Sequence, residues 1–392
     1  MQKRAGLGLV ASLAIIVAAC GGAATPAPTA APTAAPTAAA TAAPTEVPTA
    51  APPTSDLKIG VVTDIGTLDD KNYNEYTYKG VLAGAAAIGA AKPPAVVPKD
   101  SNEYAAKIDA YVKQGFNVIV TVGFNIGGDT TAAAHANPDI WFVGVDQSPI
   151  CVDETGAPDP TFACKGDAAT LLPKYISINF QEDQAGYLAG IIAASVSKNG
   201  VIGAIGGTSL CGPCVRYIQG YELGAKSVNP NIKVFSAYVT NDFSGAAFND
   251  PVGGKKFAQS FITTNKPDVL FQVAGKTGNG VLDAACEANL YGVGVDVDQA
   301  ISYPNAAKCI VTSAEKHLEI ATGSVIQAIN AGSAKGGDLL FDAKTQGIGA
   351  SPGHDLAALI TPDIQAKVDA AMAAMITGSL VTCPPDSCGQ LK

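Results

Sequence analysis

The sequence predicts an α/β fold that is built from two doubly wound lobes. Short runs rich in Val and Ile alternate with longer stretches rich in Ala, which is the order expected for parallel strands joined by crossover helices. Nine such runs are more than one open parallel sheet comfortably holds, so we expect two sheets rather than one.

The expected strands are short and almost continuously apolar, as strands covered on both faces usually are. They lie at residues 58–63, 117–122, 140–145, 175–180, 201–206, 232–239, 268–274, 291–295 and 309–312. Helices are expected between them because the intervening stretches are long enough to cross over to the next parallel strand. These helices lie at residues 74–88, 103–114, 183–197, 215–228, 253–264 and 278–288.

Each lobe is expected to be discontinuous in sequence. We place the first crossing between the lobes near residues 174–180 and a return near Thr312. This division assigns residues 58–177 and 313–337 to one lobe, and residues 178–312 and 338–392 to the other. Ligands of open α/β sheets bind beyond the carboxyl ends of the strands, so the expected site is a cleft between the lobes.

Residues 1–20 have the features of a bacterial lipoprotein signal peptide. Lys3 and Arg4 precede an apolar run from Leu7 to Ala19, which is too short to span a membrane. The segment VAAC that ends at Cys20 resembles a lipobox, which implies cleavage before Cys20 and acylation of its thiol. The expected location is the extracytoplasmic face of the cell membrane; an export signal without lipid attachment is the alternative.

Residues 21–57 are expected to form a disordered tether. Between residues 23 and 55 the chain repeats Ala, Pro and Thr, and Glu46 is the single charged residue. Such a segment has almost no large apolar side chains with which to build a core. Frequent proline favours an extended chain, so the tether would let the folded part move well away from its anchor.

The composition argues against a nucleic-acid partner and against catalysis. The formal net charge is −9, so the basic surface that neutralises phosphates is missing. The chain has three histidines, His135, His317 and His354, and contains no H-E-x-x-H, G-x-S-x-G or paired-carboxylate signature. We therefore expect a protein that is not an enzyme and that uses neither a cofactor nor a metal ion.

The cysteines are expected to form disulfides. In an exported protein, an even number of cysteines beyond Cys20 favours disulfides over metal ligands or free thiols. Nearest neighbours in sequence are the expected partners, although other connectivities are possible. The expected pairs are Cys151 with Cys164, Cys211 with Cys214, Cys286 with Cys309, and Cys383 with Cys388.

The segment CGPC, which holds Cys211 and Cys214, has two interpretations. It matches the thioredoxin active site and lies between a strand and a helix, where the pKa of a thiol is readily lowered. A thiol-disulfide oxidoreductase is therefore one alternative. However, Leu210 stands where that family usually has tryptophan, and the match covers these four residues alone. The other interpretation is a structural disulfide that tightens a loop at the cleft.

Several separated segments of the chain match one known family when they are read in order. They are TDIGTLDDKNYN, VGFNIGGDT, FVGVDQ, FQEDQAGYLAG, GYELGAKSVNP, VAGKTGNGVLDAACE, GVDVDQ and IVTSAEK. Over roughly residues 58–349 the chain thus resembles the basic membrane protein family, which comprises lipid-anchored substrate-binding proteins of ABC importers, of the purine-nucleoside-receptor type. The resemblance implies a type I periplasmic-binding-protein fold, with two Rossmann-like lobes joined by three crossing strands.

The resemblance also implies a function and partners. An extracytoplasmic receptor of this kind binds a nucleoside, in the first place a purine nucleoside, and passes it to an ABC permease and its ATPase. The same fold could instead bind a sugar or an autoinducer, for transport or for sensing.

Acidic residues near the ends of expected strands are the first candidates for ligand binding. Asp296 directly follows the strand at 291–295, and in the resembling family an Asp at this place holds the ribose. A carboxylate accepts hydrogen bonds from both hydroxyls of a vicinal diol. Asp298 is the expected cap of the next helix. Of the adjacent pair near residue 74, we assign Asp69 to helix capping and Asp70 to the ligand.

Aromatic and amide residues are expected to recognise the base. Tyr73 occupies the place where the family usually has a phenylalanine that stacks on the base. Asn74 carries a donor and an acceptor that suit a purine edge, although helix capping would also explain it. Phe124 either covers the second face of the base or belongs to the core. Asp146 follows the strand at 140–145 and is an expected base contact.

The last candidates lie in the segment GKTGNG and at Lys316. The glycines let the backbone approach a ligand closely, and the helix that opens here offers free amides to a hydroxyl group. We assign Gly275, Thr277 and Gly278 to the ligand site. The segment does not have the order of a phosphate-binding P-loop. Lys316 matches the lysine of the family's TS-x-x-K pattern and is expected to reach the sugar.

Overall fold

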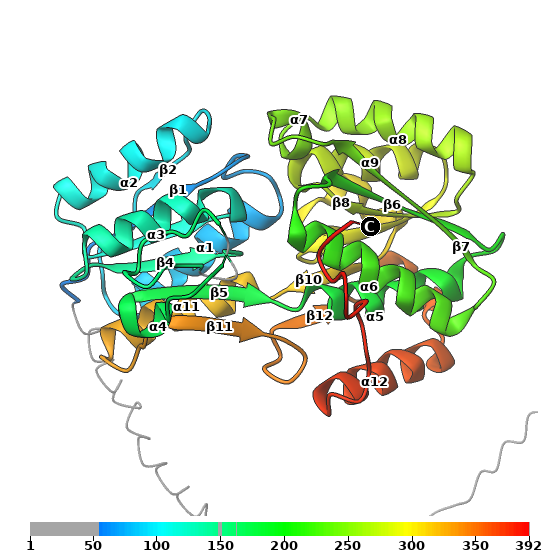
Figure 1. The fold of residues 1–392 in the computed structure, drawn as a ribbon. Helices are drawn as coiled ribbons and strands as arrows, with labels where there is room; N and C mark the ends of the chain where they lie inside the picture. The colour runs from blue at the N-terminus through cyan, green and yellow to red at the C-terminus, as the bar shows by residue number, and fades with distance from the viewer. Residues whose placement is uncertain (1–54, 148–150, 162, 392) are drawn as a thin grey trace, which may run out of the picture. The chain divides into compact units, whose positions relative to one another are not determined.

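The computed structural model describes residues 55–147, 151–161 and 163–391 (Figure 1). The expected signal peptide, the lipidation site Cys20 and almost all of the expected tether lie outside these residues.

Two six-stranded sheets organise the described residues. One sheet contains β1 (Ile59–Thr63), β2 (Ala95–Val96), β3 (Val118–Val122), β4 (Trp141–Val145), β5 (Tyr175–Phe180) and β11 (Gly337–Phe341). Its strand order is β11-β5-β4-β3-β1-β2, and every pair is parallel. The other contains β6 (Val201–Thr208), β7 (Lys233–Thr240), β8 (Val269–Val273), β9 (Tyr291–Asp296), β10 (Ile310–Lys316) and β12 (Ile348–Ala350). Its order is β12-β10-β9-β8-β6-β7, in which only β12 runs antiparallel.

Helices cover both sheets, as the alternating pattern predicts. The first lobe carries α1 (Tyr73–Ala87), α2 (Tyr104–Lys113), α3 (Gly127–Ala136), α4 (Ala168–Leu171) and α11 (Leu318–Asn330). The second lobe carries α5 (Glu182–Val196), α6 (Gly212–Val228), α7 (Gly245–Phe248), α8 (Pro251–Asn265), α9 (Gly275–Glu287), α10 (Gln299–Ser302) and α12 (Pro362–Ile376). Short 3₁₀ helices add Ser101–Glu103, Phe124–Ile126, Pro304–Cys309 and His354–Leu359.

All nine expected strands are present, with bounds that differ by a few residues, and the structure adds β2, β11 and β12. The chain passes between the two sheets after Phe180, after Lys316 and between Phe341 and Ile348. Strands β5 and β10 each lie wholly in one sheet, so the crossings fall at their carboxyl ends. The exact residue ranges that the sequence assigns to the two lobes remain a prediction.

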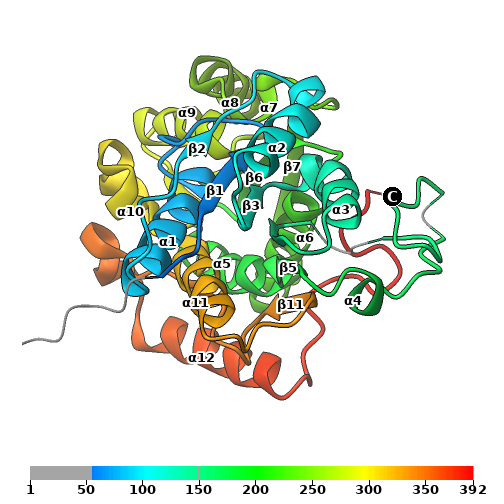
Figure 2. The same ribbon diagram turned by 90° about the vertical axis from the view of Figure 1, so that its left-hand side faces the viewer.

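Helix α11 returns to the first lobe and packs on α1, as both views show (Figures 1 and 2). Glycine makes the close contact possible, because a Cβ at Gly80 would lie 2.6 Å from the Cα of Glu319. A single cluster of buried hydrophobic residues contains residues from strands of both sheets, such as Val120 of β3 and Val295 of β9. The two lobes therefore share a core beside the crossings.

Helices α5 and α6 also pack at close range, and this contact positions side chains near the candidate site. A Cβ at Gly220 would lie 2.0 Å from the backbone oxygen of Asp183, and a Cβ at Gly186 would lie 2.1 Å from that of Tyr217. Only glycine allows the two backbones to come this close. The contact holds the start of α5, with Glu182, beside Arg216 of α6.

Candidate functional site

A cavity lies between the lobes, at the carboxyl ends of strands from both sheets. It contains about 580 Å³ of space free of protein atoms, part of which is open to solvent. The first lobe lines it with Asp64, Ile65, Asp70, Tyr73, Asn74, Gly123, Phe124 and Asp146. The wall on the side of the second sheet is made by Cys211, Pro213, Cys214, Tyr217, Phe248, Val273, Gly275, Val295, Asp296 and Lys316. Of the predicted ligand residues, only Thr277 and Gly278 are absent from the lining of the whole cavity.

Lys316, the last residue of β10, is surrounded by three carboxylates. Its Nζ contacts Asp146 Oδ2 and lies 3.5 Å from Glu182 Oε1 and 3.6 Å from Asp296 Oδ1. Burial alone would lower the pKa of Lys316, but the charges of these carboxylates outweigh burial and raise it. The lysine is therefore a buried cation that holds acidic groups of both lobes together.

Arg216 supplies a second cation at the edge of this cluster. Its Nε donates to Glu182 Oε2 at 2.7 Å. Burial alone would raise the pKa of the Glu182 carboxyl group, but Arg216 and Lys316 lower it. The Tyr217 hydroxyl donates to Asp296 Oδ1 at 3.1 Å. One oxygen of Asp296 is thus held in place by the protein.

Asp146 and Asp296 occupy matching positions in the two lobes. Each one ends a Gly-Val-Asp sequence at a strand, β4 or β9, and each has left-handed backbone geometry, with φ of 56° and 62°. This conformation is uncommon for residues other than glycine, but Asp tolerates it. Burial raises the pKa of both carboxyl groups. The paired geometry turns one acidic group from each lobe toward the cavity.

Aromatic rings from both lobes complete the wall. Tyr73 lies with its ring centroid 5.0 Å from Lys316 Nζ, and its hydroxyl donates to the backbone oxygen of Val145 at 3.1 Å. Phe124 is half-buried, and its ring centroid lies 6.3 Å from that of Phe248 in the second lobe. Phe124 lies at the cavity wall and also packs against the core, and its contact with a base stays a prediction.

Comparison with known proteins identifies the family of this chain. A family model described as "ABC transporter substrate-binding protein PnrA-like" matches residues 57–377. The chain belongs to this family. The resemblance to basic membrane proteins predicted from the sequence is thereby confirmed. Proteins of this family are extracytoplasmic, membrane-associated substrate-binding proteins of ABC transporters.

Two relatives of this chain are a nucleoside-binding protein and a basic membrane protein by name. The chain is 29% identical to the "ABC transporter nucleoside-binding protein BmpA" of Lactococcus lactis, over 62% of this chain and 65% of that protein. It is 30% identical to "Basic membrane protein A2" of Borrelia garinii, over 67% of this chain and 69% of that protein. The aligned part thus spans just under two thirds of the Lactococcus protein.

A solved structure shows the same fold. An ABC transporter solute-binding protein from Aeropyrum pernix is 21% identical and superposes with a TM-score of 0.69, covering 84% of this chain and 94% of that one. The predicted fold class, an α/β type I periplasmic-binding-protein fold with two parallel-sheet lobes, is confirmed.

The described residues contain neither a membrane-spanning helix nor a cluster of metal ligands. No helix in that part of the PnrA-like chain is both long enough and apolar enough to cross a membrane. The same residues hold no group of three or more His, Cys, Asp or Glu side chains that could bind a metal ion.

The capping role that the sequence assigned to Asp69 belongs to Asp70, whose assignment to the ligand stays a prediction. Asp70, which we gave to the ligand alone, accepts hydrogen bonds from the backbone N–H groups of Asn72, Asn74 and Glu75 at 2.9 to 3.1 Å. It thereby caps the free backbone N–H groups at the start of α1, and it also borders the cavity. Asp69, the expected cap, points to the second lobe and pairs with Lys276 at 3.0 Å.

Thr277 and Gly278 do not face the cavity, because α9 begins at Gly275, one turn earlier than expected. The buried Thr277 hydroxyl donates to the backbone oxygen of Ala246 at 3.0 Å and accepts from the Asp250 N–H at 2.8 Å. A Cβ at Gly278 would lie 1.6 Å from Gln272 Oε1, so this glycine provides room for a buried side chain. Their assignment to the ligand site was wrong.

We expect Thr277→Val to lower the free energy of unfolding by about 1 to 3 kcal/mol, since the backbone groups of Ala246 and Asp250 would lose their partner. Ligand affinity should change less than about twofold, because the side chain does not reach the cavity. Urea unfolding and calorimetric titration of the same preparation measure the two quantities. An unchanged stability with a large loss of affinity would contradict this placement.

Several residues of the site were missed from the sequence. Asp64 follows β1 just as Asp146 follows β4, so the same strand-end signal could have identified it. Its carboxylate accepts from the N–H groups of Ile65 and Asn125. Glu182, Arg216 and Tyr217 come from the first turns of α5 and α6, and the packing of these two helices brings them to Lys316 and Asp296.

Asp64 should make stability depend on pH. Burial raises the pKa of this carboxyl group to about 7. The folded state then holds the proton more tightly than the unfolded state, so this group lowers the free energy of unfolding as pH rises from about 4 to about 7. We expect Asp64→Asn to stabilise the protein by a few kcal/mol at pH 8 and to have little effect at pH 4.

Urea unfolding at pH 4, 6 and 8 measures this dependence. The matched control is Asp109→Asn, which changes an exposed carboxylate of α2 and should leave the pH profile unaltered. Equal profiles for wild type and Asp64→Asn would contradict the prediction.

The four expected disulfides are confirmed: Cys151–Cys164, Cys211–Cys214, Cys286–Cys309 and Cys383–Cys388. One of them, Cys211–Cys214, lies at the cavity wall.

Proposed function

We propose that this protein binds a nucleoside, in the first place a purine nucleoside, in the cavity between its lobes. It would act as a lipid-anchored receptor that delivers the ligand to an ABC permease driven by its ATPase. The observation that carries the proposal is the combination of aromatic rings and buried acidic acceptors in one enclosed cavity. A nucleoside offers a flat ring and several hydrogen-bond donors, which match these two kinds of surface.

Unpaired acceptors support a ligand rich in donors. Asp146 Oδ1 and Asn74 Oδ1 are buried and have no hydrogen-bond partner among the described residues. Buried acceptors without partners are costly, so a ligand that donates to them gains affinity. In our proposal the N–H groups of the base meet these two oxygens, while the base stacks between Tyr73 and Phe124.

The ribose would lie against the other end of the acidic cluster. Tyr217 donates to one oxygen of Asp296, and Lys316 lies beside the same oxygen. The remaining oxygen would accept from the sugar hydroxyls, Lys316 would donate to them, and Gly275 would allow close approach of the backbone. The nucleoside named in the description of the Lactococcus relative agrees with this assignment.

Polar contacts already join the lobes across the cleft. Asn279 Nδ2 donates to the backbone oxygen of Asp70 at 3.0 Å, and Ser302 Oγ donates to that of Lys71 at 2.7 Å. Together with the pair Lys276–Asp69 they hold the loop before α1 against the second lobe. The described conformation is therefore a closed one. We propose that closure around the nucleoside is the change that the permease recognises.

A thermal-shift panel tests the proposed ligand class. After unfolding and refolding with disulfides intact, the protein is heated with guanosine, adenosine, inosine, cytidine, ribose or galactose. A ligand present at about 100 times its Kd adds roughly 2.7 kcal/mol of stability, so at least one purine nucleoside should raise the Tm by several degrees. A shift with ribose or galactose alone would instead identify a sugar receptor.

Lipid attachment at Cys20 is proposed from the lipobox alone, since that residue lies outside the described ranges. Mass spectrometry of the mature N-terminal residue from membranes tests it. A diacylated cysteine is expected, and an unmodified N-terminus at another residue would contradict it.

A further inference from the structure

We propose that the Cys211–Cys214 disulfide is part of the surface that contacts the ligand, so that ligand binding and reduction of this disulfide oppose each other. The inference rests on the proposed function, because it requires a small molecule in the interlobe cavity. It assigns a role to the CGPC segment, which the family resemblance leaves unexplained.

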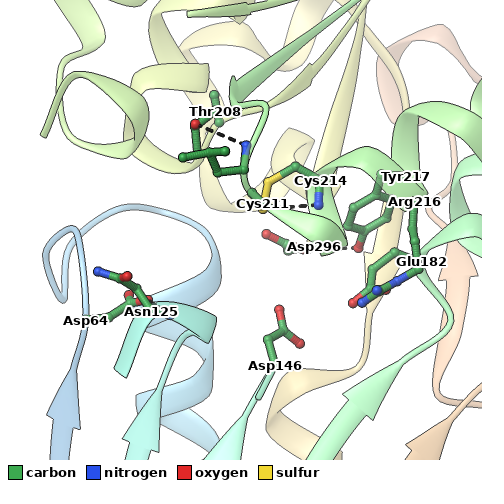
Figure 3. Close-up of a disulfide and its surroundings, with 12 residues drawn as sticks. Asp64, Asn125, Asp146, Glu182, Thr208, Cys211, Cys214, Arg216, Tyr217 and Asp296 are labelled. Atoms are coloured by element: carbon green, nitrogen blue, oxygen red, sulfur yellow. Dashed lines mark hydrogen bonds and ion pairs between the residues drawn. A yellow bond between two sulfur atoms is a disulfide. The ribbon is translucent and has the colours of Figure 1, made fainter. Parts of the chain in front are cut away.

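The position of the disulfide supports this role. Cys211, Pro213 and Cys214 all line the cavity, and the two cysteines are otherwise buried, with 2% and 6% of their surface exposed. Figure 3 shows the sulfur atoms on the side of Asp296 and Tyr217, with Asp64 and Asp146 across the space. A thiol from solvent would therefore reach these sulfurs by way of the cavity that the ligand occupies.

The disulfide also positions the acidic cluster. Cys211 is the N-cap of α6, and the Cys214 N–H points to Cys211 Sγ at 3.1 Å. Arg216 and Tyr217 follow within the same first turns of the helix and hold Glu182 and Asp296. Two separated thiols need more room than one S–S bond, so reduction would shift this turn and disturb the groups that the ligand contacts.

The chemistry needs a dithiol reductant. A thiolate of dithiothreitol attacks one sulfur, the S–S bond breaks, and the other sulfur leaves as a thiolate that takes up a proton. The second thiol of the reagent then closes its own disulfide, so two electrons and two protons pass to the protein. The attacking sulfur must approach in line with the S–S bond, and a bound ligand would block that approach.

Protection by ligand is the central measurement. The protein is exposed to dithiothreitol with and without saturating guanosine, samples are alkylated over time, and the modified cysteines are quantified by mass spectrometry. We expect guanosine to slow reduction of Cys211–Cys214 by about tenfold or more, in the range of ordinary coupling between two sites. The control is Cys286–Cys309, which lies outside the cavity and whose Cys309 is similarly buried, with 7% exposed. Its rate should not change.

A titration of the same sample separates the two proposals. Heat of binding without protection of Cys211–Cys214 would overturn this inference alone. Absence of heat with guanosine, adenosine and inosine would overturn the proposed nucleoside function, and the access route is then decided by Lys276→Ala, which removes the ion pair across the cleft. Faster reduction of Cys211–Cys214 alone in that variant supports the cavity-facing assignment, and equal rates overturn it.

A double variant tests the contribution to affinity. Cys211→Ala/Cys214→Ala should weaken guanosine binding by about tenfold, whereas Cys286→Ala/Cys309→Ala should change it by less than about twofold. Circular dichroism and urea unfolding show whether each variant is folded, and the protection experiment decides the question if one is not. Catalytic reduction of insulin that is lost in Cys211→Ser would also overturn the proposal, because a protein substrate cannot enter this cavity.

Discussion

Replacing Lys316 with methionine is expected to destabilise the protein by about 3 to 5 kcal/mol. Methionine fills a similar space but does not carry the positive charge that Asp146, Glu182 and Asp296 face. Removing one partner of a buried ion cluster costs more than the cluster itself contributes, because the remaining charges stay desolvated. Nucleoside binding should be lost at the same time, since the lysine holds groups of both lobes.

The pH dependence gives this prediction a second observable. Without the lysine, the pKa values of the neighbouring carboxyl groups should rise, so the variant should regain stability as pH is lowered. Urea unfolding at pH 5 and pH 8 measures both effects. The control is Lys113→Met, which breaks an exposed pair with Asp109 and should change stability by less than about 1 kcal/mol. A similarly small change in stability for Lys316→Met would contradict the claim that Lys316 stabilises a buried ion cluster.

Asp296→Asn should weaken nucleoside binding by a hundredfold or more. The amide offers a neutral acceptor in place of a charged one, and each charge-assisted hydrogen bond contributes roughly 1.5 to 3 kcal/mol. Loss of two such bonds to a ribose corresponds to at least about 3 kcal/mol, hence the expected factor in Kd. Stability should change little or improve, because one of several crowded negative charges disappears.

The matched control for this variant is two residues away. Asp298 accepts from the Ala300 N–H at 3.2 Å, which caps α10 as the sequence predicts. Asp298→Asn should therefore preserve affinity within about threefold. Calorimetric titrations of both variants decide the question, and wild-type affinity in Asp296→Asn would remove this residue from the proposed site.

The strands were predictable because a buried parallel strand needs an unbroken run of apolar residues. Strands β2, β11 and β12 were missed because they lie at sheet edges, where pairing depends on neighbours distant in sequence, and β2 and β12 are also short. The first half of helix α3, residues 127–131, consists of glycines, threonines and an aspartate, which have low helix propensity, so its start depends on packing in the first lobe.

The site was predictable where one local rule decided the outcome. Acidic residues that directly follow a strand, such as Asp146 and Asp296, reach the cavity because the sheet fixes their direction. The rule does not apply to Asp69 and Asp70, which lie in the loop before α1 and not directly after a strand; their directions depend on this loop, in which Lys71 has φ of 62°. The assignment of Thr277 failed for a different reason, because the start of α9 was misplaced by three residues.

Glu182, Arg216 and the wall formed by Cys211 and Cys214 depend on how helices pack, and no local pattern indicates that. The disulfide pairing was predictable because neighbours in sequence are close in space in short loops. Its position at the cavity was not, since this depends on the orientation of α6.

The central claim is that the two lobes enclose a nucleoside, and calorimetric titration of ligand-free protein at pH 7 tests it most directly. We predict saturable one-to-one binding of guanosine, adenosine or inosine, with a Kd in the micromolar range or below. No heat from any of the three, at tens of micromolar protein, would contradict the account.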